Sequence, residues 1–262
     1  MAVPTAILEA ARDGDRDRVL AWLDAPDVEE TRDVNAVGET LGGRNLTLLM
    51  MVASRLDSER CLELARDLVR RGADVNHHSV SEDLRVIVVA LGSLQGAGIG
   101  EFVRDFVILL IENGLEFDEL TALYALSSFL PDQGQSSRFL AEIFFAMVRA
   151  GAPISHVVRE CQLEETNHPA LAHDEHWVSC RALAEGVEAA GGSWAGYRRM
   201  QRKEVLRLRS LVLRGRAPPH STSHSTRGDD PVVARVLRLP DELAWKVLGF
   251  WRATSDITGE VI

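Results

Sequence analysis

The sequence predicts an all-α solenoid of four to five helix pairs, followed by a C-terminal capping helix and a tail helix. The main observation is a pattern that occurs three times: the end of an apolar helix, a glycine, and a short extended exit. The three glycines are Gly72, Gly114 and Gly151. Glycine suits a helix end because the left-handed backbone conformation found there disfavours a side chain. A recurrence of about 40 residues is typical of stacked-repeat proteins.

The composition is that of a folded intracellular protein. Of the 262 residues, 46% are hydrophobic and 26% are charged, which provides for a sizeable core and excludes disorder throughout. No apolar stretch approaches the roughly 20 residues of a membrane span, and the N-terminus lacks the layout of a signal peptide. The formal net charge of −10 argues against general affinity for nucleic acid or anionic lipid. We therefore expect a cytoplasmic or nuclear protein that is neither secreted nor transmembrane.

The helical spacing of apolar residues predicts successive helix pairs over residues 1–192. The expected helices are two within Ala6–Leu23, split at Asp13–Asp15, then one within Asn45–Ala53 with Glu59–Arg70, Leu84–Leu91 with Glu101–Glu112, Leu120–Phe129 with Arg138–Arg149, and Ile154–Leu163 with His176–Ala190. We expect Asp15 to cap the second helix and either Asn45 or Thr47 to cap the third. The run Val86–Val89 also fits a buried strand, but the repeat register favours a helix.

Two segments before predicted helices have the composition of projecting hairpins, and we call them the first and second fingers. The first is Ala36–Arg44, which is glycine-rich, and the second is the polar segment His77–Asp83. Fingers and inner helices of a stacked-repeat protein form an extended surface that contacts a partner. The candidate partner-binding residues are Glu39, Arg44, His77, His78, Glu82, Asp83 and Arg85, with Asp118 and Glu119 in the next loop.

One complete unit resembles an ankyrin repeat. It consists of Asn45–Ala53, a second helix over 59–70, and the loop Arg71-Gly-Ala-Asp-Val-Asn76. In that family a short helix follows a Thr-Pro-Leu-His-like start, and a Gly-Ala-Asp-Val-Asn-like loop leads to the next unit; here Leu48 replaces the proline and Met50 the histidine. The resemblance implies divergent ankyrin repeats and a non-catalytic function in which the partner is another protein.

The sequence contains no recognisable catalytic or cofactor motif. It has no Gly-x-Ser-x-Gly or His-Glu-x-x-His sequence, and the glycine-rich stretch Gly92–Gly100 lacks the Lys-Ser/Thr end of a phosphate loop. We therefore expect neither an enzyme nor a bound cofactor. The best metal candidate is a group of histidines and cysteines formed by Cys161, His168, His173, His176 and Cys180. Its spacing matches no known zinc finger, so a polar loop that carries histidines is the simpler interpretation and no metal site is predicted.

The C-terminal third divides into three parts. Residues 193–217 form a basic helix, in which positions 198–217 carry eight Arg or Lys against one Glu. Its apolar face is expected to close the stack, with nucleic acid or membrane binding as the alternative. Residues 218–235 have the composition of a disordered linker, and 236–262 are expected to contain an amphipathic tail helix from Pro240 to about Arg252.

Part of this region resembles a SOCS box, the element that follows ankyrin repeats in some ubiquitin-ligase substrate receptors. The matching segments are Leu208–Arg214 and Leu237–Leu248, although Arg209 stands where that family has cysteine. Segment 239–243, Leu-Pro-Asp-Glu-Leu, also resembles the opening helix of an F-box. The resemblance implies an alternative function as a substrate-recognition adaptor of a cullin-type ubiquitin ligase. Leu208 and Leu213 would then face elongin, and the cullin-facing residues would be Leu239, Pro240, Leu243 and Leu248.

Overall fold

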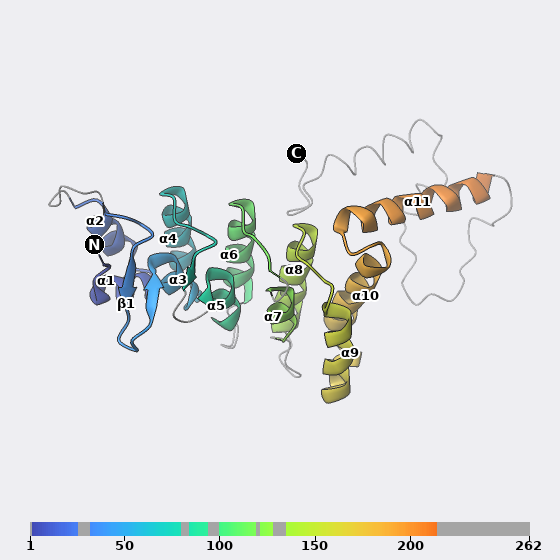
Figure 1. Ribbon diagram of the computed structural model, residues 1–262, viewed down its shortest axis with the longest axis horizontal. Helices are drawn as coiled ribbons and strands as arrows, with labels where there is room; N and C mark the ends of the chain where they lie inside the picture. The colour runs from blue at the N-terminus through green and yellow to red at the C-terminus, as the bar shows by residue number, and fades with distance from the viewer. Residues whose placement is uncertain are drawn as a thin grey trace. The chain divides into compact units, whose positions relative to one another are not determined.

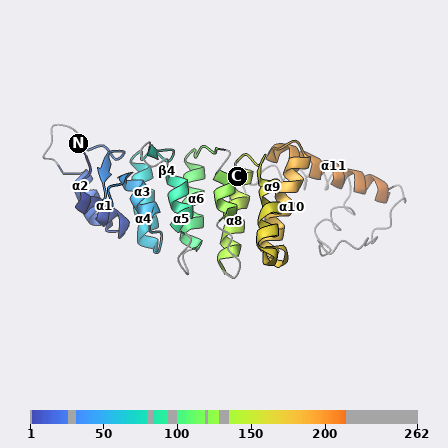
Figure 2. The same ribbon diagram turned by 60° about the horizontal axis from the view of Figure 1, so that its bottom comes forward.

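The structure is a computed structural model that describes residues 2–25, 32–79, 84–93, 100–118, 121–127 and 135–213 (Figures 1 and 2). Most of these residues are helical, as predicted, and the strands among them form two short hairpins. Contacts divide the chain into two units, Met1–Ala184 and Glu185–Ile262. Within the described residues, none of the helices combines the length and the hydropathy of a membrane span.

The helices of the first unit lie close to the predicted ranges. They are α1 (Thr5–Arg12), α2 (Arg16–Leu23), α3 (Leu48–Ala53), α4 (Glu59–Arg70), α5 (Val86–Gly92), α6 (Gly100–Glu112), α7 (Thr121–Ser127), α8 (Gln135–Arg149), α9 (Val157–Asn167), the 3-10 helix η2 (Pro169–His173) and α10 (Glu175–Ala189), within which this unit ends. The predicted start of α5 at Leu84 was wrong, because Leu84 and Arg85 pair with a neighbouring strand instead. The segment Val86–Val89 is helical, which confirms the predicted helix over the strand alternative.

Neighbouring helix pairs contact each other through both of their helices. Helix α1 packs on α2, α3 on α4, α5 on α6, and α7 on α8. The first helices of the pairs also contact one another in the order α1, α3, α5, α7 and α9, and the second helices do so in the order α2, α4, α6 and α8. Both views show α3–α4 and α5–α6 side by side, and Figure 1 shows α7 beside α8.

Side-chain caps fix where two of these helices begin. Asp15 accepts a hydrogen bond of 3.2 Å from the backbone N–H of Arg18 and so caps α2, as predicted. Thr47 rather than Asn45 caps α3, because its hydroxyl accepts from the N–H of Met50. Helix α3 lies at the centre of the packing: each residue of Leu48–Ala53 is at most 4% exposed.

The exit loops that follow the first three helix pairs are joined by two asparagine side chains. The amide of Asn35 donates to the carbonyl of Gly72 (3.1 Å) and accepts from the N–H of Asp74 (2.6 Å). One loop further on, Asn76 donates to the carbonyl of Gly114 (2.9 Å) and accepts from the N–H of Glu116 (2.7 Å). We call these two sets of bonds the asparagine bridges, and each of them fixes the position of one exit loop against the next.

The residues around each bridge prepare its geometry. Gly72 and Gly114 have φ values of +88° and +85°, a conformation that residues with a side chain rarely adopt. This confirms the predicted helix ends and turns each carbonyl toward the preceding loop. Two residues before each asparagine an aspartate accepts the asparagine's own backbone N–H, Asp33 at 2.8 Å and Asp74 at 2.9 Å.

The fourth helix pair is attached differently. The exit loop after α6 has Asp118 where the two preceding exit loops have Asn35 and Asn76. The carboxylate of Asp118 accepts a hydrogen bond of 2.7 Å from the N–H of Thr121. It therefore caps the start of α7. Helices α6 and α8 are instead joined by Arg104, which bonds Glu142 at 2.9 Å, while Arg138 bonds the same carboxylate at 2.9 Å.

The second unit begins with the end of α10 and continues into α11 (Trp194–Leu213). Gly192, with φ of +76°, donates its N–H to the carbonyl of Val187 and ends α10. A Cβ on Gly186 would lie 2.6 Å from the ring of Tyr197, so a larger residue at this position would displace the ring that packs α11 on α10. The predicted linker 218–235 and tail helix 236–262 lie outside the described residues.

Replacing Asn76 with alanine should lower the stability of the protein. Asn76→Ala removes both bonds of one bridge, and because the freed backbone groups can bond to water, the expected loss is about 1–2 kcal/mol. Thermal or urea denaturation measures it. Asn113→Ala is the matched control, since the Asn113 amide donates to the carbonyl of Leu109 at its own helix end (2.8 Å) and, among the described residues, bridges no two loops. Equal stability of the two variants would contradict a joining role for Asn76.

The ion pairs between α6 and α8 predict a loss of stability in acid. Partial burial acts to raise the pKa of Glu142, but hydrogen bonds from Arg104 and Arg138 outweigh it, so this pKa lies below its usual value of 4.5. A lowered folded-state pKa means that the ionised group stabilises the fold above pH 4.5, and that this contribution is lost as the pH falls through the folded pKa.

The test is the difference in unfolding free energy between wild type and Glu142→Gln, measured by urea denaturation from about pH 7 to about pH 3. Wild type should be the more stable protein at pH 7, and the difference should shrink in acid. In an Arg104→Met background the pH dependence of the difference should be smaller. A difference that stays constant over the whole range would show that the pairs with Glu142 do not stabilise the fold.

Candidate binding surface

The first finger is a closed antiparallel hairpin. Strand β1 (Val37–Glu39) pairs with β2 (Asn45–Thr47), with Val37 opposite Thr47 and Glu39 opposite Asn45. The turn between them is closed by three hydrogen bonds: the N–H of Thr40 donates to the carbonyl of Arg44 (2.8 Å), the N–H of Arg44 to the Thr40 hydroxyl (3.1 Å), and the N–H of Gly43 to the carbonyl of Thr40 (2.9 Å). A hairpin is present as predicted, but the predicted end at Arg44 was wrong, because Asn45–Thr47 forms the second strand and the first finger continues to Thr47.

The first finger is also attached on both sides. On the β1 side, the N–H of Val3 donates to the carbonyl of Val37 (3.2 Å), and the hydroxyl of Thr5 to the carbonyl of Glu39 (3.1 Å). On the β2 side, the hydroxyl of Ser79 in the second finger donates to the carbonyl of Asn45 (3.1 Å). The finger is therefore held in one position relative to α1 and to the second finger.

Gly38 makes the attachment to the N-terminal residues possible. A Cβ at this position would lie 2.3 Å from the carbonyl oxygen of Val3 and 2.9 Å from a methyl group of Leu8. Neither contact is sterically allowed, so a larger residue would push the first finger away from α1.

The second finger is shorter in the described residues. Strand β3 (His78–Ser79) pairs with β4 (Leu84–Arg85), with His78 opposite Arg85. His78 is exposed and His77 is partly buried. Glu82, Asp83 and Glu119 lie outside the described residues, so their proposed contacts remain predictions.

Two of the predicted partner-binding residues are paired with each other. The guanidinium of Arg85 lies 3.4 Å from the carboxylate of Asp118, and each side chain is about one-third exposed. Because Asp118 also caps α7, both groups have roles within the fold. The sequence could not reveal this pair, since the two residues belong to different predicted elements.

The exposed residues of the first finger include one that the sequence analysis missed. Glu39 and Arg44 are exposed, as expected for partner-binding residues. Between them lies Leu41, which is 85% exposed. The available signal was a single large apolar residue in an otherwise polar, glycine-rich turn.

The first helix of each pair, which we call the inner helix, contributes to the candidate binding surface to a different extent from pair to pair. Helices α3, α5 and α7 contain no charged residue. Because α3 is buried, it presents no side chain to a partner, so the predicted contribution of the inner helices does not include α3. On α5, Val88 and Val89 are partly exposed, and on α7 Tyr124 is 45% exposed.

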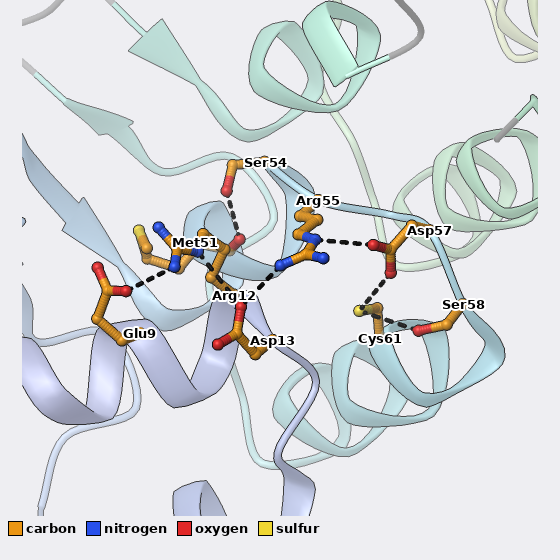
Figure 3. Close-up of polar contacts among 9 residues, drawn as sticks. All are labelled: Glu9, Arg12, Asp13, Met51, Ser54, Arg55, Asp57, Ser58 and Cys61. Carbon is orange, nitrogen blue, oxygen red and sulfur yellow. Dashed lines mark hydrogen bonds and ion pairs between the residues drawn. The ribbon is translucent and has the colours of Figure 1, made fainter. Parts of the chain in front are cut away.

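A polar network joins the turns of the first two helix pairs (Figure 3). Arg55, from the turn between α3 and α4, bonds Asp13 of the α1–α2 turn at 2.9 Å and Asp57 of its own turn at 2.7 Å. Arg12 joins the network by donating to Asp13 at 3.4 Å, and it also donates to Glu9 at 2.6 Å. Since these carboxylates are engaged by arginines, the network serves to hold the two pairs together.

The candidate metal ligands do not gather around one point. Cys161 and Cys180 are buried, whereas His168 and His173 are exposed. Burial raises the pKa of the Cys180 thiol, which disfavours the thiolate that a metal binds. Among the described residues no three His, Cys, Asp or Glu side chains are placed to hold a metal ion.

Comparisons with known proteins add nothing to this geometry. No family model, curated protein or solved structure matches the chain. Of the residues proposed to contact ubiquitin-ligase components, Leu208 and Leu213 lie in α11. The other four, Leu239, Pro240, Leu243 and Leu248, lie outside the described residues. The ligase alternative therefore remains a prediction.

Substitution of Gly38 tests how the first finger is attached. Gly38→Ala should destabilise the protein by about 1–3 kcal/mol, because the added methyl group overlaps Val3 and Leu8. Gly42→Ala is the control: among the described residues an added Cβ would meet the Thr40 hydroxyl at 3.9 Å, an ordinary contact, so the variant should denature like wild type. If both variants are as stable as wild type in thermal denaturation, the first finger does not pack against the N-terminal residues in this way.

Proposed function

We propose that the chain is an ankyrin-like α-solenoid that binds another protein through its fingers and through α5 and α7, without catalysing a reaction. The solenoid is supported by the contacts of each helix pair with the next and by the asparagine bridges at equivalent positions of successive exit loops. Bridges that recur in this way are what a stack of similar units requires, because each unit must meet its neighbour in the same register.

The observation that best supports the proposal is that the first finger is fixed in position and yet exposes charged side chains. Its turn is closed by three hydrogen bonds and its strands are attached to Val3, Thr5 and Ser79, yet it exposes Glu39 and Arg44. A binding loop that is already fixed loses little conformational entropy when a partner docks. Exposed groups of opposite charge on such a loop favour a partner with the complementary arrangement.

Helices α5 and α7 supply the apolar part of the proposed surface. Because they carry no charge, a partner that covers Val88, Val89 and Tyr124 removes no charged group of these helices from water. An apolar centre beside charged finger residues is the usual composition of a protein–protein interface. We infer that the partner contacts the fingers with polar groups and α5 and α7 with apolar ones.

Exchanging the charges of the first finger tests the proposal. Full-length protein and a version that ends near Gly215 are used to purify partners, and the affinity of the partner that both recover is measured. Glu39→Arg with Arg44→Glu should weaken this affinity by roughly tenfold or more, because complementary contacts become like-charge contacts.

The matched control is the same exchange on α4, Arg60→Glu with Glu63→Arg, which are both exposed and lie outside the proposed surface. Circular dichroism and thermal denaturation establish that both variants fold. Unchanged affinity in the finger variant, or an equal loss in the α4 variant, would rule out the proposed surface. Partners that bind only the full-length protein would point to the C-terminal tail instead.

A further inference from the structure

Leu41 stands at the tip of the first finger and has almost no role in folding. With 85% of its surface exposed, it buries too little area to add measurably to the core. It is also the most exposed of the large apolar side chains that the structure describes; the next is Leu163 on α9, at 49%. Hairpin formation does not require a leucine here, since the turn is closed through Thr40, Gly43 and Arg44.

The backbone around Leu41 is fixed on both sides. Thr40 accepts from Arg44 through its hydroxyl and from Gly43 through its carbonyl, while Gly43 adopts a φ of +77° that favours glycine. These bonds enclose Leu41 and Gly42 in a turn of defined shape. An apolar side chain presented from such a turn can be buried by a partner at the cost of its own rotamer freedom alone.

We infer that Leu41 is the anchor residue of the first finger, and that the partner is a folded protein with an apolar pocket that receives this side chain. The inference rests on the proposed function, because it takes the first finger as part of the binding surface. The exposed groups that flank Leu41 define the rim of the pocket: a cation opposite Glu39 and an anion opposite Arg44. Leu41 thus supplies affinity, and the two charged residues orient the finger.

The same surroundings disfavour other classes of partner. Insertion of Leu41 into lipid would bring Glu39 and Arg44 to the hydrocarbon boundary, and desolvation of those charges costs more than one leucine gains. Nucleic acid binds chiefly through its phosphates, and the first finger carries one carboxylate for its one guanidinium. A protein pocket is the environment in which a single branched apolar side chain is fully buried.

Site-specific photo-crosslinking identifies what Leu41 contacts. A photoreactive amino acid is placed at position 41 of the full-length chain, and in a second sample at position 163 as the control. Irradiation in cell extract should join position 41 to a protein that position 163 does not reach.

The crosslinked protein is then purified, and its affinity is measured for wild type, Leu41→Ala, Leu41→Asp and Leu163→Ala. Leu41→Ala should bind roughly ten- to a hundredfold more weakly, the value of burying one leucine side chain, and Leu41→Asp more weakly still. Leu163→Ala should bind like wild type.

Each other outcome overturns a specific part of the inference. A partner that binds wild type and Leu41→Ala equally would leave the proposed function in place and reject Leu41 as the anchor. A crosslink from position 41 to a second copy of the chain would reject a separate partner. If neither crosslinking nor purification with wild type recovers a protein, the proposed function and the role of Leu41 fail together. Because Leu41 is so exposed, its variants are expected to fold like wild type, which circular dichroism checks.

Discussion

The asparagine bridges join the exit loops of the first three helix pairs and set how these pairs are placed relative to one another. The burial of apolar helix faces drives the pairs together, but it is non-directional and does not by itself fix the register. A side-chain amide supplies what burial lacks, because Asn35 and Asn76 each donate to one backbone group of the next loop and accept from another. Since the fingers continue from these loops, the bridges also position the candidate binding surface.

The chemistry that joins neighbouring pairs changes along the chain. Asp118 occupies the next position of the pattern, and an ionised carboxylate cannot donate as the asparagine amides do. It caps α7 and pairs with Arg85 instead. Ion pairs between Arg104 and Glu142 then join α6 to α8. The exit loops of the first three pairs are therefore linked by neutral amide bonds, in addition to the ion pair of Arg55 with Asp13, whereas the fourth pair is linked by charged groups, whose strength depends on pH.

The features that sequence predicted correctly depend on near neighbours in the chain. The positive φ values of Gly72, Gly114 and Gly151, the cap at Asp15 and the hairpin of the first finger each follow from a few adjacent residues. The asparagine bridges were missed because each joins residues about 40 positions apart, where no local pattern indicates a partner. The same reason explains why α3 was not recognised as fully buried: its surroundings are supplied by α1, α4 and α5.

The candidate binding surface also contains residues whose exposure the sequence predicted and one whose exposure it did not. The exposure of Glu39 and Arg44 followed from the hairpin, but the exposure of Leu41 became evident only in the structure.

Hydrogen exchange of the native protein, followed by NMR, tests the asparagine bridges most directly. The backbone amides of Asp74 and Glu116, which donate to the bridging asparagines, should exchange far more slowly than free peptide. Exchange at the rate of an unprotected loop would show that the exit loops are not joined and that the asparagines do not hold the helix pairs in place.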